Sequence, residues 1–118
     1  MKPSGVIPKD EQLAALADGM TAFYRLIEKY SGKPLIGDFR AYATVTKAEL
    51  ANYLRKHPGL AERHVTKESD AIKLHDLPVL LSENDRWLLC WIDHGRKVNE
   101  VRFDDINEAA ANLLMAYW

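Results

Sequence analysis

The chain has 118 residues, enough for one domain with a hydrophobic core and too few for two domains of ordinary size. Hydrophobic residues make up 47% of it and charged residues 28%, a composition that excludes an intrinsically disordered chain. The formal net charge of −1 supplies no general positive field for nucleic acid or an anionic membrane. We therefore expect one domain over residues 1–118.

The sequence also predicts the cellular compartment of the protein. Its first residues lack the apolar segment of a signal peptide, and no apolar run reaches the ~18 residues of a membrane span. Cys90 is the single cysteine, so it cannot form an internal disulfide. Because it lies within an apolar run, it is expected to be a buried thiol. These features favour a cytoplasmic location without membrane association.

Apolar residues at spacings of three and four predict one long first helix, with Asp10 as its N-cap and Ser31-Gly32 at its end. The apolar stripe consists of Leu13, Leu16, Met20, Phe23, Ile27 and Tyr30. Such a stripe is typical of core packing, and the alternative is the seam of a helix–helix dimer. Gly19 costs this helix about 1 kcal/mol relative to alanine, which suggests a close crossing with another element.

A second helix is predicted to begin at Thr46, because Thr46 and Glu49 have the spacing of a capping box, and to end at His57-Pro58-Gly59. The preceding residues, 33–45, fit either short edge strands or a packed loop. Residues 60–76 are polar, and we expect a short helical turn from Leu60 followed by a loop through Lys67–Asp70.

Three strands follow at Leu77–Leu81, Trp87–Ile92 and Val98–Phe103. Pro78 restricts the first strand to an edge or itself to a first position in the strand, and Ser82–Asp85 has the composition of a turn. The second strand is apolar at every position, as is typical of a central strand that is covered on both faces.

The connection around His94-Gly95 decides the register of the second hairpin. A two-residue loop would pair Trp87 with Arg102, whereas a three-residue loop, His94–Arg96, pairs Trp87 with Phe103 and Leu89 with Val101. The second register gathers the large apolar side chains on one face, so we predict the three-residue loop.

A last helix is predicted after Asp105, with Glu108 completing a capping box. Its apolar stripe consists of Ile106, Ala109, Ala110, Leu113, Leu114 and Tyr117. We expect this stripe to pack on the sheet face that carries Trp87, Leu89, Val101 and Phe103. The predicted fold class is α+β: two N-terminal helices, a three-stranded or slightly larger antiparallel sheet, and a C-terminal helix packed on the sheet.

The residues that could carry chemistry form no recognised motif. The four histidines, His57, His64, His75 and His94, lack the spacings of a zinc site. A thiolate at Cys90 is disfavoured by its apolar neighbours, and Asp104-Asp105 is better explained by helix capping than by acid–base catalysis. We therefore predict a chain that is not an enzyme and has no catalytic residue, metal site or cofactor.

Two binding functions remain. Residues 46–67 have some character of a helix-turn-helix, with the later hairpin as a wing, so a small winged-helix-like DNA-binding regulator is one alternative. Its phosphate contacts would be Arg55, Lys56, Arg63 and Lys67. Acidic residues interrupt this set and the chain is nearly neutral, so we do not expect nucleic acid as the partner.

The other binding function is contact with a basic protein. Acidic residues recur in predicted loops and turns around one end of the sheet, where they could steer such a partner. The acids expected to contact it are Glu68, Asp70, Glu83, Asp85 and Asp93.

The segment from Trp87 to Leu114 resembles the C-terminal module of small bacterial immunity proteins from polymorphic and contact-dependent toxin systems. In both, an aromatic-rich strand leads through a polar turn with glycine, here Asp93-His94-Gly95, to a charged strand ending in Phe, and then to an acidic cap and an Ala/Leu helix. The resemblance implies a cytoplasmic, non-enzymatic antitoxin, a monomer or weak dimer, that binds the C-terminal toxin domain of a secreted effector. Such toxins include ribonucleases and NAD glycohydrolases.

Overall fold

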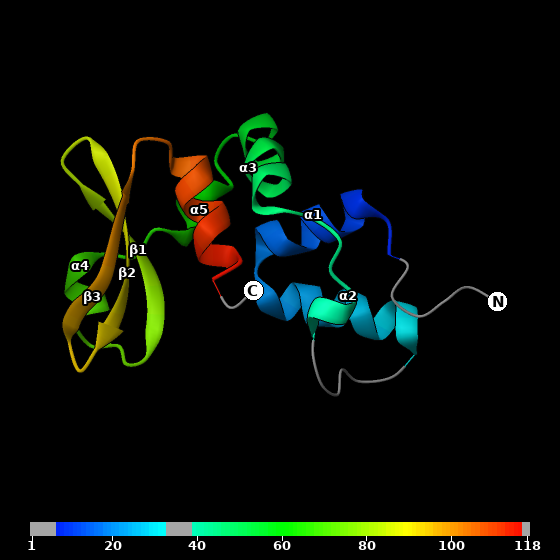
Figure 1. The fold of residues 1–118 in the computed structure, drawn as a ribbon, viewed down its shortest axis with the longest axis horizontal. Coiled ribbons are helices and arrows are strands. Elements are labelled where there is room, and N and C mark those ends of the chain that lie inside the picture. Colours follow the sequence, from blue (N-terminus) through cyan, green and yellow to red (C-terminus); the bar gives the residue numbers. More distant parts are fainter. Residues whose placement is uncertain (1–6, 33–38, 117–118) are drawn as a thin grey trace.

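A computed structural model describes residues 7–32 and 39–116 (Figure 1). Three longer helices and three short helical segments come first, followed by three strands and a last helix. In order they are α1 (Lys9–Asp18), α2 (Met20–Ser31), η1 (Phe39–Ala41), α3 (Lys47–Lys56), η2 (Ala61–His64), α4 (Glu68–Ala71), β1 (Leu77–Glu83), β2 (Arg86–Asp93), β3 (Arg96–Phe103) and α5 (Ile106–Leu114). The strands form one antiparallel sheet in the order β1-β2-β3, so the predicted α+β class is confirmed.

Helix α5 lies between the sheet on one side and α1 and α3 on the other (Figure 1). Because it is covered on both sides, its consecutive residues Ala109, Ala110 and Ala111 all have no exposed surface. Small side chains allow neighbours to approach the helix closely on each side. One cluster of buried side chains accordingly includes residues from all four longer helices and from β1.

The two faces of the sheet contribute to different parts of the core. On the α5 side, Leu80 is buried, and Trp87 and Phe103 pack against the helical cluster. Val101, which we predicted to lie under α5, is 50% exposed, so α5 covers only the part of this face around the Trp87–Phe103 pair. The opposite face forms a second cluster, which Ala71 of α4 helps to cover. This cluster consists of Ala71, Val79, Leu81, Leu88, Cys90 and Ile92.

The prediction of one long first helix is wrong, because the chain turns at Gly19 between α1 and α2. Gly19 has φ 127° and ψ 175°, a conformation that is essentially restricted to glycine. A Cβ placed there would meet nothing within 4 Å, so the glycine serves this turn and does not mark a close crossing. The apolar stripe nevertheless faces the core, since Leu16, Phe23 and Ile27 have no exposed surface.

Replacing Gly19 with alanine is expected to destabilise the fold by about 1–3 kcal/mol, through the strained backbone alone. Gly32→Asn provides the matched control, because Gly32 has φ 74° at a helix C-cap, a left-handed conformation that asparagine tolerates. Urea unfolding of both variants measures the difference. Equal losses at the two positions would contradict the special role of Gly19.

The β2–β3 hairpin combines features of both registers that we considered. Trp87 pairs with Phe103 and Leu89 with Val101, as predicted, but Asp93 also pairs with Arg96 across a two-residue turn. A β-bulge reconciles the two, because Cys90 lies opposite both Asn99 and Glu100 and the register shifts there by one residue. Asn99 in the bulge and His94 in the turn both have positive φ, of 54° and 51°.

Helix α3 has the predicted capping box, with Thr46 and Glu49 each accepting from the other's backbone N–H. Asp105 caps α5 through the N–H of Asn107 and not through a box with Glu108. Helix α1 begins after Pro8, so Asp10 is not its cap. The turn after Leu60 is confirmed as η2, whereas the loop predicted through 67–70 contains α4.

Part of the ambiguous segment, residues 33–38, lies outside the described residues, as does Tyr117 of the predicted α5 stripe. Phe39–Ala41 form a short 3₁₀ helix and not a strand. Within residues 7–32 and 39–116, no helix has the length and apolar character needed to cross a bilayer.

Candidate functional site

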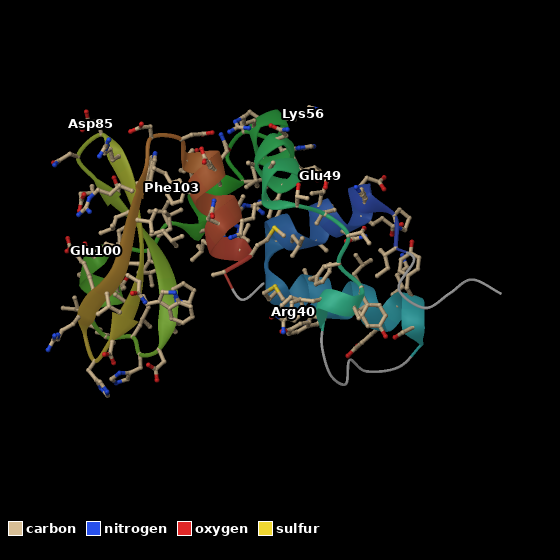
Figure 2. All side chains as sticks on the ribbon, viewed as in Figure 1. Arg40, Glu49, Lys56, Asp85, Glu100 and Phe103 are labelled. Atoms are coloured by element: carbon tan, nitrogen blue, oxygen red, sulfur yellow. The ribbon has the colours of Figure 1, made fainter. Side chains whose placement is uncertain are left out.

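The five predicted contact acids do not gather at one end of the sheet. Asp85 lies in the β1–β2 turn and Glu83 just before it, whereas Asp93 ends β2 beside the opposite turn. Figure 2 shows Asp85 at the tip of its hairpin. Glu68 and Asp70 belong to α4, which lies toward the Asp93 end because Glu68 pairs with Lys97. The expectation of one acidic edge is therefore wrong, and the acids divide between the two ends.

Glu83 and Glu68 are engaged within the fold. The Glu83 carboxylate accepts from Nε of Arg102 at 2.6 Å, linking β1 to β3 across the central strand. This hydrogen bond lowers the pKa of Glu83, and the one from Lys97 to Glu68 raises the pKa of Lys97. A partner would have to compete with these ion pairs, so both residues are better suited to bracing the sheet than to binding.

The remaining acids are more accessible. Asp70, Asp85 and Asp93 are exposed, and within the described residues the carboxylates of Asp70 and Asp85 form no ion pair. Asp93 lies 3.6 Å from Nε2 of His94. A visiting protein can reach all three carboxylates, and of the three only Asp93 has an internal contact to give up, the one with His94.

The histidines make local contacts, and the cysteine is buried. His64 contacts the carbonyl oxygen of Ala17 through Nε2 at 2.7 Å, and the rings of His75 and His94 meet edge to face at 5.1 Å. Cys90 is fully buried, and burial raises the pKa of its thiol. No group of three or more metal-ligating side chains is found in the part of the chain that the structure describes.

The structure does not contain the helix-turn-helix of the DNA-binding alternative. The segment after α3 forms η2, a four-residue 3₁₀ helix, which is too short to serve as a recognition helix in the major groove. Two of the proposed phosphate contacts also have acidic partners within the fold, because Arg55 pairs with Asp105 and Arg63 with Asp18. These features disfavour DNA binding through this segment.

A groove of about 210 Å³ lies between α3 and α5. Its lining includes small alanines as well as charged and amide side chains: Lys47, Ala48, Ala51, Asn52, Arg55, Glu108 and Asn112. No pattern in the sequence predicted that these residues line a groove together. Their helical spacings, such as 48, 52 and 55 or 108 and 112, are readable in the chain, but the packing of α3 against α5 is not.

Each of the two helices that form the groove has a charged carboxylate at its N-terminal end, Glu49 in α3 and Asp105 before α5. Burial acts to raise the pKa of Asp105, but hydrogen bonds from Arg55 and the Asn107 N–H outweigh it, so this pKa lies below its ordinary value. The Thr46 backbone N–H and Lys9 lower the pKa of Glu49. Both carboxylates are thus stabilised in the charged form.

The capping carboxylate Glu49 predicts a pH-dependent stability difference. Because its folded pKa lies below 4.5, its stabilising contribution is complete above that pH and is lost as the pH falls through the folded pKa. Glu49→Gln keeps an acceptor for the Thr46 N–H but loses the ion pair with Lys9. The wild type should therefore be the more stable protein at neutral pH, and the difference should vanish in acid.

Urea unfolding midpoints over a pH series measure this difference. Glu28→Gln is the control, because it removes an exposed carboxylate that forms no ion pair with the described residues. The same acid-sensitive difference in the control would contradict the assignment to the capping contact.

Comparison of the chain with protein-family models, with curated proteins and with solved structures finds no match.

Proposed function

We propose that this chain is an immunity protein of a contact-dependent toxin system, which binds the C-terminal toxin domain of a secreted effector and neutralises it. The observation that carries the proposal is the presentation of exposed carboxylates at both ends of one sheet: Asp85 on one hairpin, and Asp93 with Asp70 of α4 toward the other. The resemblance of residues 87–114 to such proteins supports it. The chain acts in the cytoplasm as a monomer or weak dimer.

The position of these carboxylates suits a rigid inhibitor. Each hairpin tip is held by paired strands, so little conformational entropy is lost when the tip meets a partner. A ribonuclease or NAD glycohydrolase binds substrate phosphates with positive charge, and protein carboxylates can occupy the same positions. Complementary charge raises the rate of association more than the final affinity.

The toxin domain can contact the acids at one end of the sheet or at both ends. The eight residues of β2 span roughly 26 Å, a distance comparable to the width of an interface of standard size. A single toxin domain lying across the sheet can therefore reach both hairpin tips. Glu68 and Glu83 then act indirectly, by fixing α4 and the sheet through Lys97 and Arg102.

Reversing two exposed acids, Asp70→Lys with Asp85→Lys, is expected to slow association with the toxin domain roughly tenfold at low salt and less at high salt. The measurement is the association rate constant, by surface plasmon resonance or stopped flow. Glu28→Lys with Glu62→Lys is the matched control, because it changes the net charge equally through exposed residues of α2 and η2. Equal slowing by both pairs would contradict a contact at the sheet ends.

A further inference from the structure

The α3–α5 groove has an ordered arrangement of polar groups that the proposed function does not use. The two helices run antiparallel (Figure 1): Arg55 near the end of α3 binds Asp105 at the start of α5, with Nε to Oδ2 at 3.0 Å, and Lys47 at the start of α3 lines the same groove as Asn112 near the end of α5. Counted from this contact at the same rise per residue, Asn52 lies near the level of Glu108, and Lys47 and Ala48 lie near that of Asn112. Ala48 and Ala51 add no bulk beyond a methyl group, so a ligand can approach the helix backbones closely.

Two amide side chains in the groove are held by contacts that leave one end of each amide available. Asn52 accepts from Nη1 of Arg55 through Oδ1 at 2.6 Å, so its Nδ2 remains as a donor. Asn112 donates from Nδ2 to the Glu108 carbonyl oxygen at 2.9 Å, so its Oδ1 remains as an acceptor. Neither of these remaining atoms bonds to the residues that the structure describes. A fixed donor and a fixed acceptor are what the C=O and N–H of a peptide backbone require.

The placement of the two amides fits an extended chain. Asn52 belongs to α3 and Asn112 to α5, so they face the groove from its two walls. In an extended strand, the backbone N–H and C=O groups of successive residues point to opposite sides. One peptide segment can therefore reach both amides without bending.

The charges at the groove indicate which side chains that segment carries. Arg55 is neutralised by Asp105, whereas Glu108 and Lys47 form no ion pair within residues 7–32 and 39–116. Glu108 lies near the Asn52 level and Lys47 near the Asn112 level, so the two ends of the groove have opposite charge. The volume of about 210 Å³ is below the range of about 300–1,000 Å³ that is typical of drug-sized ligands.

From these observations we propose that the α3–α5 groove binds a short extended segment of a partner protein, through its backbone and through a basic and an acidic side chain two residues apart. The basic side chain lies at Glu108 and the acidic one at Lys47. This site is separate from the acids at the ends of the sheet and does not depend on the toxin proposal.

Titration of the full chain with blocked peptides, followed by ¹⁵N-HSQC spectra, tests the site. The probes are acetyl-Arg-Val-Glu-amide and acetyl-Glu-Val-Arg-amide, because the direction of the segment is not fixed by the amides. One of the two should produce saturable shifts at the side-chain amides of Asn52 and Asn112. Glu108→Gln should weaken its binding roughly two- to tenfold.

A variant that fills the groove distinguishes binding there from binding elsewhere on the surface. Ala48→Leu occupies the groove from an exposed position and should abolish the shifts, whereas Ala14→Leu, an exposed alanine of α1, should leave them unchanged. No saturable shift with either peptide at millimolar concentration would overturn the proposal. So would equal shifts with free arginine and glutamate, or shifts that persist in Ala48→Leu.

Discussion

Replacing Phe23 with alanine is expected to reduce the free energy of unfolding by about 3–5 kcal/mol. Phe23 has no exposed surface and belongs to the buried cluster that joins the helices to the sheet. Its removal leaves a cavity that the surrounding helices cannot fill without shifting. For a domain whose total stability is about 5–15 kcal/mol, this loss is a large fraction. Urea unfolding monitored by circular dichroism measures it.

The neighbouring residue supplies the control. Tyr24 follows Phe23 on α2 but is 39% exposed, so Tyr24→Ala should cost clearly less. A loss at Tyr24 as large as that at Phe23 would mean that α2 presents a different face to the core.

Replacing Gln12 with leucine is expected to cost about 2–4 kcal/mol, although leucine is similar in size and more apolar. Gln12 is fully buried on α1, and its amide is fully engaged. Nε2 donates to the Ile7 carbonyl oxygen at 2.7 Å and to Oγ1 of Thr44 at 2.8 Å, while Oε1 accepts from the Thr44 N–H at 2.9 Å. Leucine leaves two backbone groups, the Ile7 carbonyl and the Thr44 N–H, without these partners.

Substitutions at Thr44 should reduce stability by smaller amounts, because each affects only part of the Gln12 contacts. Thr44→Val removes one acceptor of Gln12 and should cost about 1 kcal/mol, whereas Thr44→Ser keeps the hydroxyl and should cost less. Thermal or urea unfolding of the three variants gives the order directly. A Gln12→Leu variant as stable as the wild type would show that this amide does not hold residue 44 against α1.

The sequence predicted most elements because their signals are local. The capping box of α3, the edge position of Pro78 and the alternation in the strands depend only on neighbouring residues. The break at Gly19 escaped prediction for a physical reason. A single glycine costs a helix only about 1 kcal/mol, and tertiary packing of the α1–α2 hairpin decides whether the chain turns there.

The β2–β3 hairpin was also only partly predictable from the sequence. Pairing of Trp87 with Phe103 was predictable from the apolar pattern, because a shift by one residue would move the large side chains to the other face. The means of reaching that register was not predictable. We assigned the extra residue to the turn at His94, whereas the structure places it in a bulge at Asn99 and Glu100.

The candidate sites depend on contacts between distant parts of the chain. Sequence identified acids in loops and turns, but not that Glu68 pairs with Lys97 or Glu83 with Arg102. Nor could it show that the turns carrying Asp85 and Asp93 lie at opposite ends of the sheet. The α3–α5 groove depends on residues that are about 55 positions apart or more, and no local pattern indicates such a pairing.

Under the proposed function, a toxin domain is expected to be encoded immediately upstream. Growth of cells that express the C-terminal domain of that upstream product, with and without this chain, tests the proposal most directly. The proposal predicts that co-expression restores growth and that the two proteins purify together as a tight one-to-one complex. Toxicity that persists at a tenfold excess of this chain, with no complex recovered, would contradict the proposal.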